Sequence, residues 1–195
     1  MAERKRKLTP DQTNYLIDLK KKPNEDDVRY KEIIKQKLLE DDVLMWLLNN
    51  KELEDKEAEN DEYFGINILP EFLIPNTQTD VQNYLCYETA FETQTRTTFR
   101  SGYNPDMKRQ TVIFYIICND KTCVVPEIGA ARHDLIGAIL IDKFHGFNMF
   151  GNQLVLISNQ PSVTDNHYST RTLIFEQKTT NSLTKSDGRT VNLRK

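Results

Sequence analysis

The chain has 195 residues and a mass of 22.8 kDa, which allows one domain, or one domain with a long extension, at about 100–200 residues per domain. Its 26 Lys and Arg residues against 29 Asp and Glu residues give a net charge of −3, which argues against strong, general DNA binding. Because it has three cysteines, an odd number, and neither an apolar run of roughly 18–20 residues nor the apolar core of a signal peptide, we expect a reducing compartment, no export and no membrane role.

The first third of the chain is far more charged than the rest. Residues 1–62 carry 13 basic and 17 acidic residues, whereas residues 63–195 carry 13 and 12. Within this part, residues 51–62 hold seven acids and two lysines but at most two apolar residues. Such a run is typical of a solvated loop or a frayed helix, and an acidic binding site is the alternative.

Three helices are predicted in the first third. Thr9 followed by Pro10 indicates the start of a short helix that ends before Pro23. An acidic first turn then opens a second helix, whose apolar residues are Val28, Ile33, Ile34, Leu38 and Leu39. A third short stretch, residues 43–48, contains the only tryptophan, Trp46, and is predicted to be buried.

After residue 62 the hydrophobic period changes from helical to two, which indicates strands. Residues 63–69 and 83–88 are predicted strands, and residues 90–99 are a weaker candidate before a loop at 101–108. The strongest strand is residues 111–119, which are apolar on both faces and rich in β-branched and aromatic residues. We expect this strand to lie centrally in a sheet that is covered on both sides.

The last third contains one helix and two strands. Apolar residues spaced by three and four from Ile128 to Phe144 predict the main core helix, with Gly146 as its C-cap glycine. Residues 153–158 and 168–177 are the closing strands, separated by a loop that contains Pro161 and Asp165. The basic tail from Lys178 is expected to be flexible.

These elements predict an α+β fold. A mixed, mainly antiparallel sheet is packed by one long amphipathic helix, with a helical N-terminal extension and a flexible C-terminal tail. We divide the chain into a charged extension (residues 1–30), an α+β domain (31–177) and a basic tail (178–195).

Few residues carry the pattern of a catalytic or cofactor site. No phosphate-binding glycine loop and no nucleophile elbow is present, and no cofactor is predicted. The best metal candidates are two thiols and two imidazoles, which would suit tetrahedral zinc if they converged, with structural cysteines as the alternative. They are Cys118, Cys123, His133 and His145.

Charged residues on the core helix are candidates for a subunit interface. Asp134 and Asp142 lie eight residues apart and therefore share roughly one side of the helix. Arg132 and Asp134 stand near the helix start, where a local cap or ion pair and a subunit contact are both open readings.

A basic, aromatic loop precedes the central strand. It is a candidate for contact with DNA phosphates or with another ring, and a solvated hairpin tip is the alternative. Its residues are Arg96, Arg100, Tyr103, Lys108 and Arg109.

The order of elements and several segments resemble the phage neck proteins known as tail terminators, or tail-completion proteins. The resemblance covers residues 31–177 and is a pattern of element order and residue types. Its segments are KLLEDD (37–42), WLL (46–48), YFGINILP (63–70), IFYIIC (113–118), RHDLI (132–136), FGNQL (150–154) and YSTRTLIF (168–175).

This resemblance implies a non-enzymatic virion protein that closes into a ring, typically a hexamer, with a dodecamer as the alternative. Its partners would be other copies, the tail tube protein and the head-connector proteins, with transient contact to DNA in the lumen. The protein would lie in the neck of the virion, and in the host cytoplasm during assembly. Residues 1–30 and the tail, including Arg189, Arg194 and Lys195, are candidates for inter-ring contacts.

Three other functions remain open from the sequence. The nearest is a head-closure, or stopper, ring protein of the head-to-tail connector. A small metal-dependent hydrolase would use Cys118, Cys123 and His133. A DNA-binding regulator would need Arg96, Arg100 and Lys108.

Overall fold

The computed structural model describes residues 9–19, 26–72, 81–94, 107–148, 152–165 and 167–180. The helices are α1 (Pro10–Leu19), α2 (Asp26–Leu39), α3 (Asp42–Leu48), α4 (Lys51–Glu54) and α5 (Arg132–Phe144), with short 3₁₀ helices η1 (Asn60–Tyr63) and η2 (Asp120–Thr122). The strands are β1 (Ile68–Leu69), β2 (Tyr84–Gln94), β3 (Met107–Asn119), β4 (Val124–Val125), β5 (Ala130–Ala131), β6 (Val155–Asp165) and β7 (Tyr168–Thr180).

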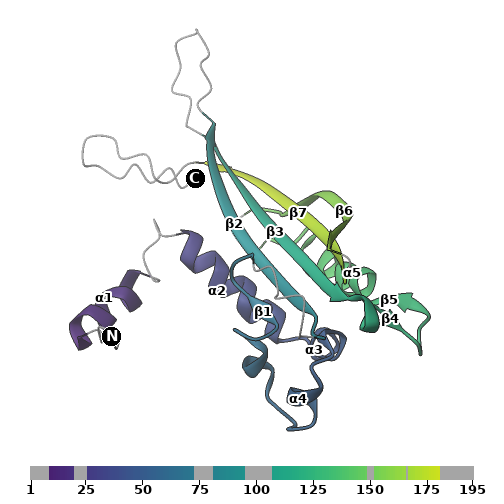
Figure 1. Cartoon of the computed structure of the whole chain (residues 1–195). Helices are drawn as coiled ribbons and strands as arrows, with labels where there is room; N and C mark the ends of the chain where they lie inside the picture. Colours follow the sequence, from purple (N-terminus) through teal and green to yellow (C-terminus); the bar gives the residue numbers. More distant parts are fainter. Residues whose placement is uncertain are drawn as a thin grey trace, which may run out of the picture.

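Five strands form one long, twisted sheet in the order β1-β2-β3-β7-β6 (Figure 1). The β1–β2 pair is parallel, and the other three pairs are antiparallel. Strands β4 and β5 form a separate small hairpin that projects at one end of the sheet (Figure 1). The fold is therefore α+β with a mixed, mainly antiparallel sheet, and β3 is the central strand, as the sequence predicts.

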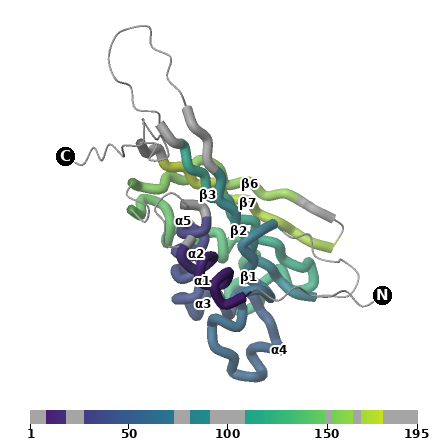
Figure 2. Tube along the Cα trace, turned by 90° about the vertical axis from the view of Figure 1, so that its left-hand side faces the viewer, coloured from purple at the N-terminus to yellow at the C-terminus, as the bar shows by residue number. Residues whose placement is uncertain are grey.

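Helices α2 and α5 cover one face of the sheet (Figure 2). Helix α5 packs against β3 and β7, α2 packs against β2, and α3 packs against α5. Three rings form the centre of this layer: Phe114 of β3 lies 4.9 Å from Phe144 of α5 and 5.8 Å from Phe175 of β7, measured between ring centroids. The predicted packing of the amphipathic helix on the central strand is confirmed.

The opposite face of the sheet carries a smaller cluster. Tyr84, Cys86, Ile117 and Tyr168 are buried there, and Tyr115 packs against them. The ring of Phe72, which follows β1, lies 4.5 Å from the ring of Tyr115. The second face of β3 is thus buried at Ile117 and half-buried farther along the strand.

The prediction of a strand at residues 63–69 is wrong for most of these residues. Tyr63 ends the 3₁₀ helix η1, and a turn follows in which Gly65 has a φ of 85°, a conformation that favours glycine. Only Ile68 and Leu69 pair with β2. Residues 83–88 and 90–99 were expected as two strands, but residues 84–94 form the single strand β2.

The core helix begins later than predicted. Residues 124–131 form the β4–β5 hairpin, whose turn contains Pro126 and Gly129 with a φ of 69°. Ile128 therefore lies in this turn, and α5 starts at Arg132. Its end is as predicted, because Gly146 follows the helix with a φ of 77°.

The closing strands are longer than predicted. The expected loop with Pro161 belongs to β6, which is an edge strand, where a residue without an N–H group can be accommodated. Two shifts in register, near residues 157 and 164, also interrupt this strand. Strand β7 continues to Thr180, two residues beyond Lys178, and residues 181–195 lie outside the described residues.

Candidate interaction surfaces

Arg132, the first residue of α5, is 5% exposed and is used within the chain. Its Nε donates to the carbonyl of Thr122 at 2.9 Å, and one terminal nitrogen donates to the carbonyl of Leu47 at 2.9 Å and of Trp46 at 3.5 Å. These last two carbonyls end α3, where helices leave carbonyl groups without intrahelical partners. Arg132 thus has a local capping role, and its subunit contact stays a prediction.

Trp46 lies beside Arg132 at the surface. The guanidinium carbon of Arg132 is 5.8 Å from the centre of the Trp46 ring. Residues 44, 45, 47 and 48 of α3 are buried as predicted, but Trp46 is 45% exposed. The sequence could not distinguish the exposed position of α3 from the buried ones, because this helix is apolar around almost its whole circumference.

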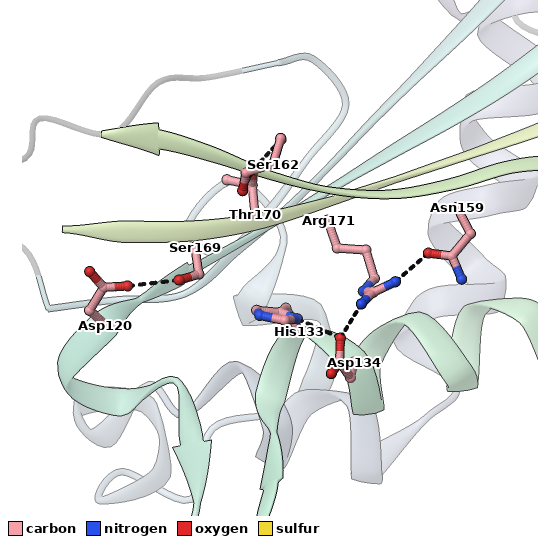
Figure 3. A network of polar contacts seen from close by, with 8 residues as sticks. All are labelled: Asp120, His133, Asp134, Asn159, Ser162, Ser169, Thr170 and Arg171. Atoms are coloured by element: carbon pink, nitrogen blue, oxygen red, sulfur yellow. Dashed lines mark hydrogen bonds and ion pairs between the residues drawn. The ribbon is translucent and has the colours of Figure 1, made fainter. Parts of the chain in front are cut away.

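Asp134 ties the start of α5 to two strands (Figure 3). Its Oδ1 accepts hydrogen bonds from Arg171 of β7 and, at 2.8 Å, from Nδ1 of His133. Arg171 also donates to Asn159 of β6. The Asp134 side chain is 48% exposed, so it takes part in this local network and still borders solvent.

Two further polar contacts in the same region hold β7 to its neighbours (Figure 3). Ser169 donates to Asp120 of η2 at 2.8 Å, and the hydroxyls of Ser162 and Thr170 lie 2.6 Å apart across β6 and β7. These contacts are structural, because each joins elements that are adjacent in the sheet or its connections.

Asp142 borders a groove between α3 and α5. The groove has a volume of about 330 Å³ and is lined by Asp41, Val43, Ala138, Ile139, Asp142 and Lys143. Asp142 is exposed, as expected for a residue on the solvent side of α5. Its predicted place in a subunit interface stays a prediction.

Two of the residues that line this groove form an ion pair. Nζ of Lys143 lies 2.8 Å from Oδ2 of Asp41, and the N–H of Leu44 donates to Oδ1 of Asp41 at 2.9 Å. Burial by itself would raise the pKa of Asp41, but these hydrogen bonds and the lysine charge hold its pKa below the usual value. Asp41 is therefore both the N-cap of α3 and its link to α5.

The predicted basic loop is only partly described. Arg109 forms an ion pair with Glu176 of β7 at 2.5 Å, and Lys108 lies next to it on β3. Arg96, Arg100 and Tyr103 lie outside the described residues, as do Arg189, Arg194 and Lys195 of the tail. The predicted DNA or inter-ring contacts of these residues remain predictions.

The four proposed zinc ligands do not converge into a site among the described residues. Burial raises the pKa of the Cys118 and Cys123 thiols, which disfavours the thiolate form that binds metal. His133 contacts Asp134, and Nδ1 of His145 accepts from the N–H of Leu156 at 3.1 Å. Across the described ranges, no three His, Cys, Asp or Glu side chains are placed to share a metal ion.

Two polar features of the structure were missed in the sequence analysis: polar side chains on the core-facing side of the sheet, and a chain of buried asparagines. Arg171 occupies a core-facing position of β7, two residues before the buried Leu173. A charged residue in the row of alternate positions that is otherwise apolar could have indicated this buried polar site. Gln110 and Gln177 extend the same core-facing rows and are 0% and 2% exposed. Polar residues at core-facing positions of the strands therefore mark where buried polar contacts lie in this sheet.

Buried asparagines form the other feature that sequence reasoning missed. Asn50 donates to Asn67 at 2.7 Å, Asn67 donates to the carbonyl of Asn83 at 2.8 Å, and Asn83 donates to the carbonyl of Leu48 at 3.1 Å. This chain of bonds joins the end of α3 to the start of β2. Asparagine in a turn-rich segment usually indicates the surface, so the sequence offered no signal.

Comparison with known proteins places the chain in a family. A family model matches residues 41–177, from the N-cap of α3 to Gln177 in β7, and the chain belongs to this family, YomW, which is phage-derived. Among solved structures, a chain of the "Virion of native gene transfer agent (GTA) particle" is similar, with 13% identity and a TM-score of 0.48, over 77% of this chain and 94% of that chain. None of the curated proteins compared with the chain matches it. Of the helices in the described ranges, none has both the length and the apolar character to cross a bilayer.

Proposed function

We propose that the chain is a non-enzymatic structural protein of a phage virion. The observation that carries this proposal is the match of residues 41–177 to a phage-derived family. The matched residues comprise α3, α5 and the strands of the sheet up to Gln177 in β7, so the similarity concerns the folded body and not a short motif.

Within the virion, the proposed place is the neck. The resemblance of residues 31–177 to tail terminators supports a ring, typically a hexamer, that joins the tail tube to the head connector and lets DNA pass. A ring needs two different surfaces on each subunit, because a head-to-tail contact closes when its rotation returns to the start. An elongated sheet with differently built ends and edges supplies such surfaces.

The charged ends of the chain are the proposed contacts to neighbouring rings. Residues 1–30 and the basic tail flank the matched region, and the tail contributes Arg189, Arg194 and Lys195. Segments of this kind can order against a partner at assembly, at a cost in affinity for the area that they bury.

The test is the copy number and position of the chain in intact particles. We expect sixfold rings of the purified chain by electron microscopy and native mass spectrometry, and label on the chain at the head-proximal end of the tail tube. Twelve copies next to the head would identify a head-closure ring instead. A chain that stays monomeric beside its partners, or that is missing from particles, would overturn the proposal.

An enzymatic role is tested separately on the same purified rings. If metal analysis found one zinc ion bound per chain, the alternative function as a metal-dependent hydrolase would be supported. Because Cys118 is buried, replacement of Cys123 by serine is the informative variant, and we expect it to leave ring formation unchanged.

A further inference from the structure

The edge of the sheet has a step where β6 stops and β7 continues. Val155, the first residue of β6, pairs with Glu176, whereas β7 extends to Thr180. Beyond Glu176, no described strand pairs with the outer edge of β7. A pocket of about 360 Å³ lies at this step, lined by Gln153, Val155, Ile157, Glu176 and Gln177. Val155 and Ile157 are 47% and 49% exposed, so the pocket has apolar walls that face solvent.

Gln177, which lines the pocket, has a buried side-chain amide with an unpaired oxygen. Nε2 of Gln177 donates to Oε1 of Gln110 at 2.7 Å. This single bond leaves Oε1 of Gln177 and Nε2 of Gln110 without a hydrogen-bond partner among the described residues. An unpaired buried polar group destabilises the fold, and an incoming donor would remove that cost. The site therefore combines the unpaired edge of β7, the apolar walls of the pocket and the unpaired amide oxygen of Gln177. Together these features suit the binding of an extended segment of chain.

The other end of the sheet carries a surface of the opposite shape. The β4–β5 hairpin projects there (Figure 1), and its Val124 and Ile128 side chains are 60% and 57% exposed. Strand β3 leads from the step, where Gln110 pairs with Gln177, to the hairpin, which begins five residues after Asn119. Because this strand separates the two surfaces, one chain cannot bring its own hairpin to its own step.

The charges at the two ends are complementary. At the step end, the described charges of Arg109 and Glu176 form an ion pair, and the two chain segments that connect to the strands there, 95–106 and 181–195, carry six basic and two acidic residues in the sequence. At the hairpin end, Asp120 and Glu127 outnumber Lys121, and they lie with the acidic segment 51–62, whose Lys51 and Glu52 share a surface pocket with Thr122 of η2. Contact between unlike ends is therefore favoured over contact between like ends.

We propose that the β4–β5 hairpin of one copy seats in the step at the β6–β7 edge of a second copy. The apolar hairpin residues Val124 and Ile128 lie against Val155 and Ile157, and the incoming backbone donates to Gln177. This contact is heterologous, so it closes into a ring when the rotation permits. The inference rests on the proposed ring function and names the surfaces that build the ring.

The test is a cross-link between unlike variants. In a Cys123→Ser background, where Cys86 and Cys118 are buried, the Ile128→Cys chain is mixed with the Ile157→Cys chain and oxidised. We expect a disulfide-linked dimer of unlike chains by mass spectrometry, none from either variant alone, and from the double variant a ladder that ends at the copy number of the ring. The matched control pairs Ile128→Cys with Val28→Cys, an exposed position on α2, and should give no product.

Self-association supplies the second readout. Ile157→Asp should weaken assembly about tenfold or more, whereas Val28→Asp should leave it unchanged. Higher salt should also weaken it, because the two ends carry opposite charge. Rings that form without the 128–157 product, or that cross-link like variants, would overturn this contact and leave the ring function standing. A monomer at every protein concentration in low salt would overturn both.

Discussion

At the scale of single residues, Arg132 shows how a charge is accommodated inside this fold. Its guanidinium donates to carbonyls of α3 and of the connection after β3, so one side chain fastens three parts of the chain. A buried charge without such partners would be costly, and so would the carbonyls without the charge.

We predict that Arg132→Met lowers the free energy of unfolding by about 3 kcal/mol, because the carbonyls of Thr122 and Leu47 lose the hydrogen bonds that the guanidinium donates. Urea unfolding followed by circular dichroism measures this loss. Lys121→Met, at an exposed position on η2, is the control and should change stability by less than about 0.5 kcal/mol. A stable Arg132→Met chain that fails only to assemble would instead support the subunit contact.

Asp41 gives a second prediction, which concerns pH. Asn caps a helix about as well as Asp, so Asp41→Asn keeps the cap of α3 and removes the charge that pairs with Lys143. Because the folded pKa of Asp41 is lowered, its ion pair stabilises the fold above the ordinary carboxyl pKa of 3.8 and is lost as the pH falls below it.

We therefore expect wild type to be more stable than Asp41→Asn at pH 7, by about 0.5–1 kcal/mol, with a smaller difference at pH 3. Urea titrations at the two pH values provide the measurement. Asp41→Ala should lose about 1 kcal/mol more at both, because it also removes the cap. An equal difference between wild type and Asp41→Asn at both pH values would contradict the assigned ion pair.

At the scale of elements, the close approach of α5 to β7 depends on Gly137. A Cβ atom at this position would lie 3.0 Å from Cδ of Arg171. The Arg171 side chain cannot move freely, because Asp134 and Asn159 hold its guanidinium. A glycine inside a helix is otherwise unfavourable, by about 1 kcal/mol relative to alanine.

Gly137→Ala should therefore destabilise the wild-type chain by about 1 kcal/mol, because the clash outweighs the gain in helix propensity. In an Arg171→Ala background the same substitution should stabilise by about 1 kcal/mol. Thermal or urea unfolding of the four chains gives the coupling energy between the two positions. Additive effects would show that Arg171 does not set the distance between helix and strand.

At the scale of the whole molecule, the first helix is distinct from the body. Tyr15, Leu16 and Ile17 of α1 are 60%, 46% and 46% exposed, whereas Tyr30 and Ile34 of α2 belong to the main core. The predicted boundary between residues 30 and 31 thus lies within α2. Exposed apolar residues on α1 suit the proposed contact with another ring.

Removal of residues 1–25 should change the free energy of unfolding by less than about 0.5 kcal/mol and leave rings intact. Removal of residues 1–34 should unfold the chain, because it takes Tyr30 and Ile34 out of the core. Circular dichroism and native mass spectrometry separate the two. If the shorter truncation also prevents rings from forming, α1 belongs to the contact between subunits rather than between rings.

Local pattern determined the elements that bury one continuous apolar face. The double-faced apolar run at 111–119 predicted the central strand, and the spacing of Ile136, Leu140 and Phe144 predicted the helix on it. Both could be found because burial of apolar surface is the dominant favourable term in folding, and it acts through periodicities that a sequence displays.

Only the tertiary structure showed which conformation and which contacts a residue has where a polar group or a turn interrupts the apolar pattern. Ile128 continues a helical spacing, yet it lies in the turn of the β4–β5 hairpin, beside Gly129 with its positive φ, and the helix starts at Arg132, whose guanidinium donates to the end of α3. Arg171 and Gln177 occupy core-facing places whose partners lie on other elements. A sequence shows which side chains seek burial, but the partners of a buried polar group depend on which segments the fold brings together.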